Sequence, residues 1–163
     1  MGYMAIKLDL EKACDRLELS FIHKVLQAFH FPPNLIKVIM GCVTTTSISV
    51  LVNRGVLDSF NPSRGIRQGD PLLPYLFILC IECLSHLIEL KCRDGSWTPL
   101  TASRGNVGVS HLLFVDDIIL FSKVDSRACN AIAKVLEKFC KESGQKISQG
   151  KLVFTTLLML VGR

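Results

Sequence analysis

The sequence contains no internal repeat, no low-complexity tract and no recognisable secretory leader. These absences exclude a repeat array and a flexible linker, and 163 residues are enough for one ordinary domain with a buried core. The cysteines number seven, and an odd count without a leader favours reduced thiols over a disulfide framework. We therefore expect an intracellular protein of a single domain.

The sequence also lacks a strong imbalance of charge. Its 19 Lys and Arg against 14 Asp and Glu give a net charge of +5, which suits a polyanionic partner but also suits many enzymes that never bind nucleic acid. Hydrophobic residues make up 49% of the chain, which is high for a soluble domain and indicates apolar surface that neighbouring parts of a longer protein would cover. Composition alone therefore names no function.

A paired zinc-finger pattern of cysteines is absent as well. Cys80 and Cys83 form a CxxC, but no second pair at zinc-finger spacing accompanies it. The pair lies within an apolar run of helical pattern, so two packed thiols are favoured over zinc binding or redox chemistry.

That apolar run, Leu72 to Leu90, is long enough to cross a bilayer. It contains Glu82 and Glu89, and uncompensated carboxylates are costly at mid-membrane depth. We expect a buried helix that supports a sheet, with both glutamates near its margins, and no membrane association. A small membrane protein built on this run is the alternative.

Periodicity along the chain predicts an α+β domain. Apolar residues alternate in the first ten residues, recur at helical spacing from residue 17 to the prolines at 32 and 33, and predict a short helix over residues 34–43. A strand near residues 48–52, a turn-rich loop over 61–71 and the long apolar helix follow. A hairpin around residue 116, a helix capped by Ser126 and ended by Gly144, and a strand from Lys151 complete an antiparallel sheet with helices on one side.

Three aspartates carry the chemistry. Asp116 and Asp117 stand between the apolar arms of the hairpin, where an unpaired carboxylate costs several kcal/mol to bury. No lysine or arginine lies within those arms, so a bound cation is the simplest counter-charge, and magnesium suits oxygen ligands. Asp9 ends an apolar strand that a sheet can bring beside the hairpin, and three such carboxylates can hold two metals. A polar hairpin tip facing water is the alternative for the pair alone.

Four segments appear in order along the chain: IKLDLEKACDR, SRGIRQGDPLLPYLFILCIE, LLFVDDIILF and SGQKISQGK. They resemble the successive palm motifs of reverse transcriptases (RNA-directed DNA polymerases) from plant-type non-LTR, LINE-like retrotransposons, over nearly the whole chain. The resemblance implies a polymerase palm, with an RNA template, a DNA primer and dNTP as partners. It also implies two Mg²⁺ ions as cofactors, with Mn²⁺ as a substitute, and a nuclear location.

By this resemblance, Asp9, Asp116 and Asp117 are the catalytic residues. Asp9 and Asp116 would bind both metal ions, Asp117 would complete the set, and the Leu10 carbonyl is a further candidate ligand. One ion would activate the primer 3′-hydroxyl and the other would steady the leaving pyrophosphate, without a covalent enzyme intermediate.

The resemblance also assigns nucleotide-binding residues. Gln68 and Gly69 match the segment that lies against the incoming nucleotide and template, where a small residue lets backbone approach closely. Lys151 aligns with the lysine of the fourth motif, where a cation can protonate or neutralise the departing pyrophosphate, and Lys146 is a rival for that role. A solvated polar loop and a surface lysine at a strand start are the alternatives.

The chain departs from the family pattern at three positions. Cys14 stands where a large aromatic ring usually blocks the ribose 2′-hydroxyl, so we expect it in the nucleotide-binding wall with relaxed sugar selection; simple core packing is the alternative. Leu73 replaces the usual small hydroxyl residue. Val115 replaces the usual alanine before the aspartate pair, a change that we expect to be harmless.

The parts that normally flank a palm are also missing from the pattern. No fingers segment, thumb, endonuclease domain or cysteine-histidine tail is recognisable, so we expect residues 1–163 to be a palm fragment truncated at both ends and active only in its complete parent. A catalytically dead retroelement remnant is the alternative hypothesis.

Overall fold

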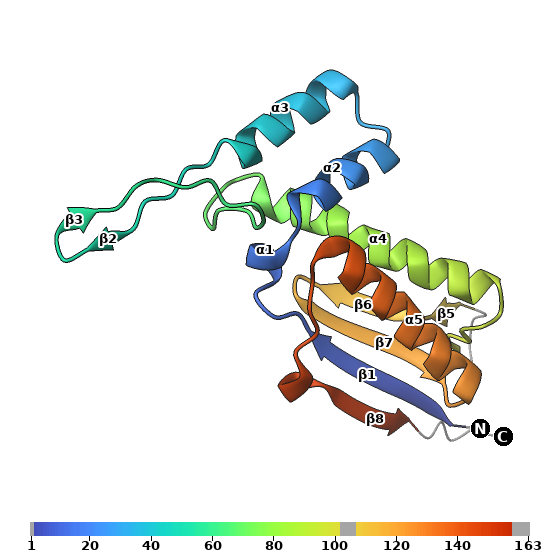
Figure 1. Ribbon diagram of the computed structural model, residues 1–163. Coiled ribbons are helices and arrows are strands. Elements are labelled where there is room, and N and C mark those ends of the chain that lie inside the picture. Colours follow the sequence, from blue (N-terminus) through green and yellow to red (C-terminus); the bar gives the residue numbers. More distant parts are fainter. Residues whose placement is uncertain (1, 102–106, 158–163) are drawn as a thin grey trace.

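The computed structural model of the protein describes residues 2–101 and 107–157 (Figure 1). The strands are β1 (Tyr3–Asp9), β2 (Leu51–Val52), β3 (Gly55–Val56), β4 (Leu100–Thr101), β5 (Gly108–Val109), β6 (His111–Phe114), β7 (Asp117–Lys123) and β8 (Val153–Leu157). The helices are α1 (Ala13–Arg16), α2 (Leu19–Ala28), α3 (Pro33–Thr44), α4 (Leu73–Arg93), α5 (Ser126–Ser143) and the 3₁₀ helix η1 (Gln149–Lys151).

The centre of the fold is a four-stranded sheet in the order β6-β7-β1-β8. Each neighbouring pair is antiparallel, and β1 lies between β7 and β8. Helices α4 and α5 cover one face of this sheet and leave the other face open (Figure 1). The predicted α+β architecture, with helices on one side of an antiparallel sheet, is confirmed.

Alternation of side chains determines which face of β1 is buried. Met4, Ile6 and Leu8 are each at most 9% exposed and belong to the core under the helices. Successive side chains of a strand point to opposite faces, so Lys7 and Asp9 lie on the open face. The burial pattern of β7 has the same period of two and begins with Asp117 on the open face.

Helix α4 is buried along one stripe. Its buried residues recur every three or four positions: Leu76, Phe77, Cys80, Ile81, Leu84, Ser85 and Ile88. Glu82 is half-buried and Glu89 is exposed, as predicted for the margins. Only 39% of its most apolar window is buried, so the helix is less buried than we predicted. Among the described residues, it is the one helix with the length and composition to cross a bilayer.

The ends of α5 confirm one prediction and correct another. The Asp125 carboxylate accepts a hydrogen bond of 2.7 Å from the Ala128 backbone N–H, so Asp125 is the N-cap and the predicted Ser126 is the first helical residue. Gly144 ends the helix at φ +77°, as predicted. A Cβ at this glycine would lie 2.7 Å from the Arg16 carbonyl oxygen.

The predicted strand near residues 48–52 forms half of a narrow arm. Short strands β2 and β3 pair at its tip, Ile48 and Phe60 form a bridge closer to the domain, and the arm projects away from the sheet (Figure 1). Leu51 and Val56 are 70% and 71% exposed, so the apolar alternation marked a hairpin without a buried face.

The connection between α4 and β6 is more ordered than its polar composition indicated. Trp97 is fully buried, and its indole N–H donates a 2.9 Å hydrogen bond to the Phe121 carbonyl. Strands β4 and β5 form a short pair within this connection, while residues 102–106 of the predicted segment lie outside the described chain.

Candidate active site

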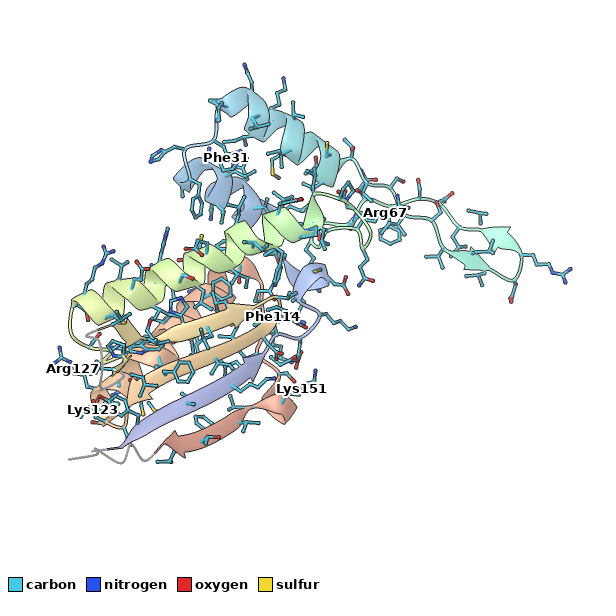
Figure 2. All side chains as sticks on the ribbon, turned by 180° about the vertical axis from the view of Figure 1, so that it is seen from behind. Phe31, Arg67, Phe114, Lys123, Arg127 and Lys151 are labelled. Carbon is cyan, nitrogen blue, oxygen red and sulfur yellow. The ribbon has the colours of Figure 1, made fainter. Side chains whose placement is uncertain are left out.

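Two of the three predicted aspartates are partners in the central ladder. Asp9, the last residue of β1, is directly opposite Asp117, the first residue of β7. Residues opposite one another place their side chains on the same face, here the open one. Asp116 is next to Asp117 in the tight β6–β7 turn, so the three aspartates gather at one edge of the sheet, as predicted. Figure 2 shows Phe114 and Lys151 at this end, with Lys123 at the other.

The turn that carries Asp116 is strained. Val115 has φ +53°, in the left-handed region that β-branched residues adopt only with strain. Its side chain is 61% exposed and therefore gains little from packing. We expected valine to be harmless here; the structure places it at a left-handed position of the turn, and the effect of the substitution stays a prediction.

Lysines from other elements neutralise two of the carboxylates. Lys151 Nζ lies 2.9 Å from Asp9 Oδ2, and Lys7 Nζ lies 3.0 Å from Asp117 Oδ1. The sequence analysis considered only the hairpin arms and therefore did not predict these two lysine counter-charges, which come from other strands and helices. The Asp9 side chain is 15% exposed against 43% for Asp117, so Asp9 is the better shielded of these two carboxylates.

Lys151 contacts Asp9, and it lies in a different element from the one that the sequence analysis predicted. It ends the 3₁₀ helix η1 and does not start a strand. The hydrogen bond to Asp9 and the charge of Asp9 raise the pKa of the Lys151 ammonium, so it stays protonated at neutral pH. The rival, Lys146, instead pairs with Glu11 at 3.0 Å.

The fourth motif is hydrogen-bonded to the end of β1. The Glu11 N–H donates to the Lys146 carbonyl at 2.8 Å, and the Ser148 N–H donates to the Asp9 carbonyl at 2.8 Å. These bonds form the bridge between Leu10 and Ile147, and they use neither carbonyl of that pair. The Leu10 carbonyl, our candidate ligand, therefore takes no part in this bridge.

Cys14 lies in α1, beside the acidic end of the sheet. Burial raises the pKa of its thiol, and the negative charges of Asp15 and Asp116 raise it further. The same side chain packs on the edge of the hydrophobic core. Its position near Asp116 is compatible with a place in the predicted wall of the nucleotide-binding site. The effect of Cys14 on sugar selection stays a prediction.

The predicted nucleotide loop is docked on α1. The Gly65 N–H donates to the Leu17 carbonyl at 2.8 Å, and the Ile66 N–H donates to the Cys14 carbonyl at 3.2 Å. Gln68 Nε2 lies 3.5 Å from Asp15 Oδ1, at the limit of a hydrogen bond. The loop that carries Gln68 therefore lies beside Cys14.

Two glycines of this loop are required for different reasons. Gly69 has φ +87°, and a Cβ there would meet no heavy atom within 4 Å in the described part of the chain. Glycine is therefore favoured at this position by its backbone conformation and not by its small size. Gly65, which our sequence analysis missed, has φ +82°, and a Cβ would lie 2.7 Å from the Asp15 carbonyl. Gly65 is what lets the loop approach α1.

Sequence reasoning also missed a buried amide that holds α1 in place. Gln145 is 4% exposed, and its Nε2 donates a 2.6 Å hydrogen bond to the Ala13 carbonyl. This bond links the fourth motif to the residue before Cys14. Lys7 was missed as well, although its position two residues before Asp9 on one strand face is a signal that period-two alternation offers.

The donor set at this end of the sheet fits hard divalent ions. Carboxylate oxygens are the ligands that Mg²⁺ prefers, and the two lysine contacts show that the carboxylates attract positive charge. Across residues 2–101 and 107–157, no three His, Cys, Asp or Glu side chains are already arranged as a metal site. Ion binding would therefore require the aspartates and their lysines to rearrange.

The palm of a nucleic-acid polymerase has an antiparallel sheet with helices on one face and an acidic turn beside a central strand, and this chain has the same arrangement. The chain belongs to the reverse transcriptase (RNA-dependent DNA polymerase) family, whose model matches residues 2–159. The predicted family is thereby confirmed.

The relatives include retrotransposon proteins. The chain is 24% identical over 161 residues to a Pol polyprotein from the type-1 retrotransposable element R2 of Popillia japonica, covering 99% of this chain and 25% of that protein. It is 27% identical to the R2DM polyprotein of Drosophila melanogaster, covering 88% and 13%. An uncharacterized mitochondrial protein of Arabidopsis thaliana is 45% identical over 67 residues, or 41% of this chain and 55% of that protein. The chain thus spans a quarter or less of these polyproteins.

Solved telomerase structures share the fold. Apo telomerase from Candida tropicalis, truncated from its C-terminal domain, matches with a TM-score of 0.72 and 16% identity, covering 99% of this chain and 32% of that one. Telomerase from Candida albicans in complex with the TWJ fragment of telomeric RNA matches with a TM-score of 0.69 and 16% identity, covering 99% and 27%. At this identity the likeness shows the fold alone.

Proposed function

We propose that this chain is the catalytic palm of an RNA-directed DNA polymerase, which adds deoxynucleotides to a DNA primer on an RNA template. The observation that carries the proposal is the register that sets Asp9 opposite Asp117 on the open face, next to the turn with Asp116. Membership of the reverse transcriptase family supports the reaction type. Fingers, thumb and endonuclease regions of a longer parent would complete the enzyme.

Asp9 and Asp116 would hold two Mg²⁺ ions, or Mn²⁺, with Asp117 completing the set and the Leu10 carbonyl as a further ligand. When bound, these ions supply Lewis acidity toward the primer 3′-hydroxyl and positive charge for the departing pyrophosphate. The protein contributes position and charge and forms no covalent intermediate.

Lys151 and Lys7 then have separate tasks. Lys151 is protonated at neutral pH, its pKa being raised further by Asp9, and it could donate a charge-assisted hydrogen bond to the pyrophosphate oxygens. Lys7 holds Asp117 Oδ1 and offsets the repulsion between Asp117 and Asp9 on the same face.

The nucleotide would bind between α1 and the loop that is hydrogen-bonded to it. Gln68 and Gly69 would contact the incoming nucleotide and template base, and Cys14 would face the sugar. The template and primer would lie over the open face of the sheet, because α4 and α5 cover the other (Figure 1).

Metal binding by the chain itself tests the proposal. Mn²⁺ binding, followed by electron paramagnetic resonance, should be at least about tenfold weaker in Asp9→Asn and Asp116→Asn, since each removes a charged ligand. Asp58→Asn, in the projecting arm, removes an exposed carboxylate and should bind like the wild type. Equal binding by all four proteins would contradict the proposal.

A catalytically dead remnant is the second candidate, favoured by Cys14 and by the strain at Val115. Grafting residues 2–159 into a complete relative and measuring primer extension on an RNA template separates the two. Metal binding without extension would support the remnant, and extension that depends on Asp9 would support the polymerase.

A further inference from the structure

The outer flank of α5 carries a row of cations. Arg127, Lys134, Lys138 and Lys141 are separated by seven, four and three residues, and a helix of 3.6 residues per turn places all four on one side. Each is exposed, and along the described chain none makes an ion pair. The row is about 21 Å long at the usual helical rise.

Two adjoining hollows make this row one wall of a groove. One, of about 710 Å³, places Lys24 of α2 opposite Lys134, Lys138 and Lys141. The other, of about 420 Å³, places Lys91 of α4 beside Arg127 and Lys134. Lys134 lines both hollows, so they adjoin along α5. We call the surface of Lys24, Lys91, Arg127, Lys134, Lys138 and Lys141 the α5 groove.

The second hollow is lined by hydrogen-bond donors and no carboxylate. Besides its three cations it contains Ser126 and Asn130, side chains that commonly donate to phosphate oxygens, whereas the Ser96 hydroxyl is already hydrogen-bonded to Asp94 and the Lys91 carbonyl. Lys91 Nζ forms an ion pair with Asp94 Oδ2 at 2.8 Å, so Arg127 and Lys134 are the cations of this hollow that have no acidic partner among the described residues. The first hollow also contains Glu18, Glu137 and Glu142, which offset part of its charge.

The groove is separate from the aspartates. It lies in the helix layer, whereas Asp9 and Asp117 lie on the open face of the sheet (Figure 1). Figure 2 shows Arg127 at the end of the sheet remote from Lys151, and α5 runs back from there to Gly144. A strand that followed the groove would therefore run along the length of the domain on the side away from the catalytic face.

We propose that the α5 groove binds the phosphodiester backbone of single-stranded RNA as a second nucleic-acid contact, independent of the polymerase site. A row of unpaired cations about 21 Å long can meet several successive phosphates, and it reads no sequence because the contacts are to the backbone. Hydroxyl and amide donors between the cations favour a phosphate chain over an acidic protein surface.

The test uses the salt dependence of RNA binding by the full chain. Lys134→Gln/Lys138→Gln/Lys141→Gln should weaken binding of a mixed-sequence RNA oligonucleotide and lower the slope of log K against log salt by about 2, since each lost phosphate contact removes about 0.7. The matched control Lys37→Gln/Arg54→Gln/Arg93→Gln removes the same charge from exposed sites elsewhere and should keep the wild-type slope.

One charge-preserving variant and a check of folding complete the test. Lys134→Arg/Lys138→Arg/Lys141→Arg should retain the slope, and unchanged circular dichroism of the glutamine variant shows that it remains folded, as expected because Gln and Lys have similar helix propensity. Equal losses in the test and control variants, or no loss in either, would overturn the proposal.

The probes also identify the ligand. DNA of the same sequence that binds more tightly than RNA would overturn the choice of RNA. Vesicles that contain phosphatidylserine test a membrane surface as the ligand. If they bind the wild type but not the glutamine variant, and the salt dependence of RNA binding is the same for both proteins, the groove binds a membrane surface instead.

Discussion

Asp9 and Asp117 stand directly opposite one another in the β1–β7 ladder, with both side chains on the open face of the sheet. Like charges in this position repel, and a strand pair that serves stability alone would avoid them. Lys151 and Lys7 contact one carboxylate each, at 2.9 and 3.0 Å. The protein thus holds its own counter-charges at the position where a catalytic cation would bind.

Lys7→Met should raise the affinity of the chain for Mn²⁺ several-fold, because it removes a cation that competes for Asp117. Mn²⁺ titration by electron paramagnetic resonance measures this, with Lys7→Arg as the charge-preserving control. The pair is half-exposed, so its loss should change the free energy of unfolding by no more than about 1 kcal/mol. Weaker Mn²⁺ binding would show that Lys7 orients Asp117 for the ion and does not compete with it.

Lys151→Met should cost stability in a manner that depends on pH. Asp9 raises the pKa of Lys151 in the folded state, so the contribution of Lys151 is fully present below the unfolded pKa and is lost as pH rises through the folded value. Urea unfolding of the two proteins should therefore differ most near neutral pH and converge in strong alkali. A difference that grows with pH would contradict the Lys151–Asp9 contact; Lys37→Met, in α3, is the control.

Val115→Gly should stabilise the protein by about 1 kcal/mol, because glycine relieves a left-handed conformation that costs an L-residue about 1–2 kcal/mol. For a domain of this size we expect the melting temperature to rise by about 2–4 °C. Val124→Gly is the control: this valine is 52% exposed and has a negative φ, so glycine there should destabilise. Equal effects of the two substitutions would rule out strain at Val115.

Gln145→Met should destabilise the protein by about 1–3 kcal/mol, because the buried Ala13 carbonyl loses its donor. Hydrogen exchange should increase in α1 before it increases in the sheet. Gln27→Met, at an exposed position of α2, should leave both quantities unchanged. Wild-type exchange in α1 of the Gln145 variant would show that the bond does not hold this helix.

Cys14→Tyr, in a complete enzyme that carries these residues, tests whether position 14 controls the choice between deoxyribonucleotides and ribonucleotides. A thiol is much smaller than a phenol ring, so the cysteine form should incorporate ribonucleotides more readily, and tyrosine should restore rejection. Single-nucleotide extension with dNTP and rNTP compares the two. Equal discrimination by two active enzymes would assign Cys14 to core packing alone.

Elements with strong periodicity could be predicted from the sequence, and the contacts between elements could not. The alternation around Ile6 and Leu8 predicted β1, and the spacing of apolar residues predicted α2 and α4. Predicting that Asp9 and the Asp116–Asp117 pair meet needed only the rule that sheets bring strand ends together.

Other features could not be predicted from the sequence because they depend on contacts between distant residues or on backbone geometry. Lys7 and Gln145 act through partners more than a hundred residues away, and no periodic signal reports such pairing. Ser126 and Asp125 are both good N-caps, so only the observed hydrogen bond to Ala128 separates them. The strain at Val115 is a backbone property that residue type alone did not reveal.

The central position of β1 affects how the chain can fold during synthesis. Its two neighbours, β7 and β8, begin at Asp117 and Val153, so β1 has no sheet partner until more than a hundred further residues have been synthesised. Long loops must close before these pairs form, which slows folding. A nascent chain would therefore expose the apolar side chains of β1 until these residues have been made, and chaperone binding to Tyr3–Asp9 should decline only after β8 has been synthesised.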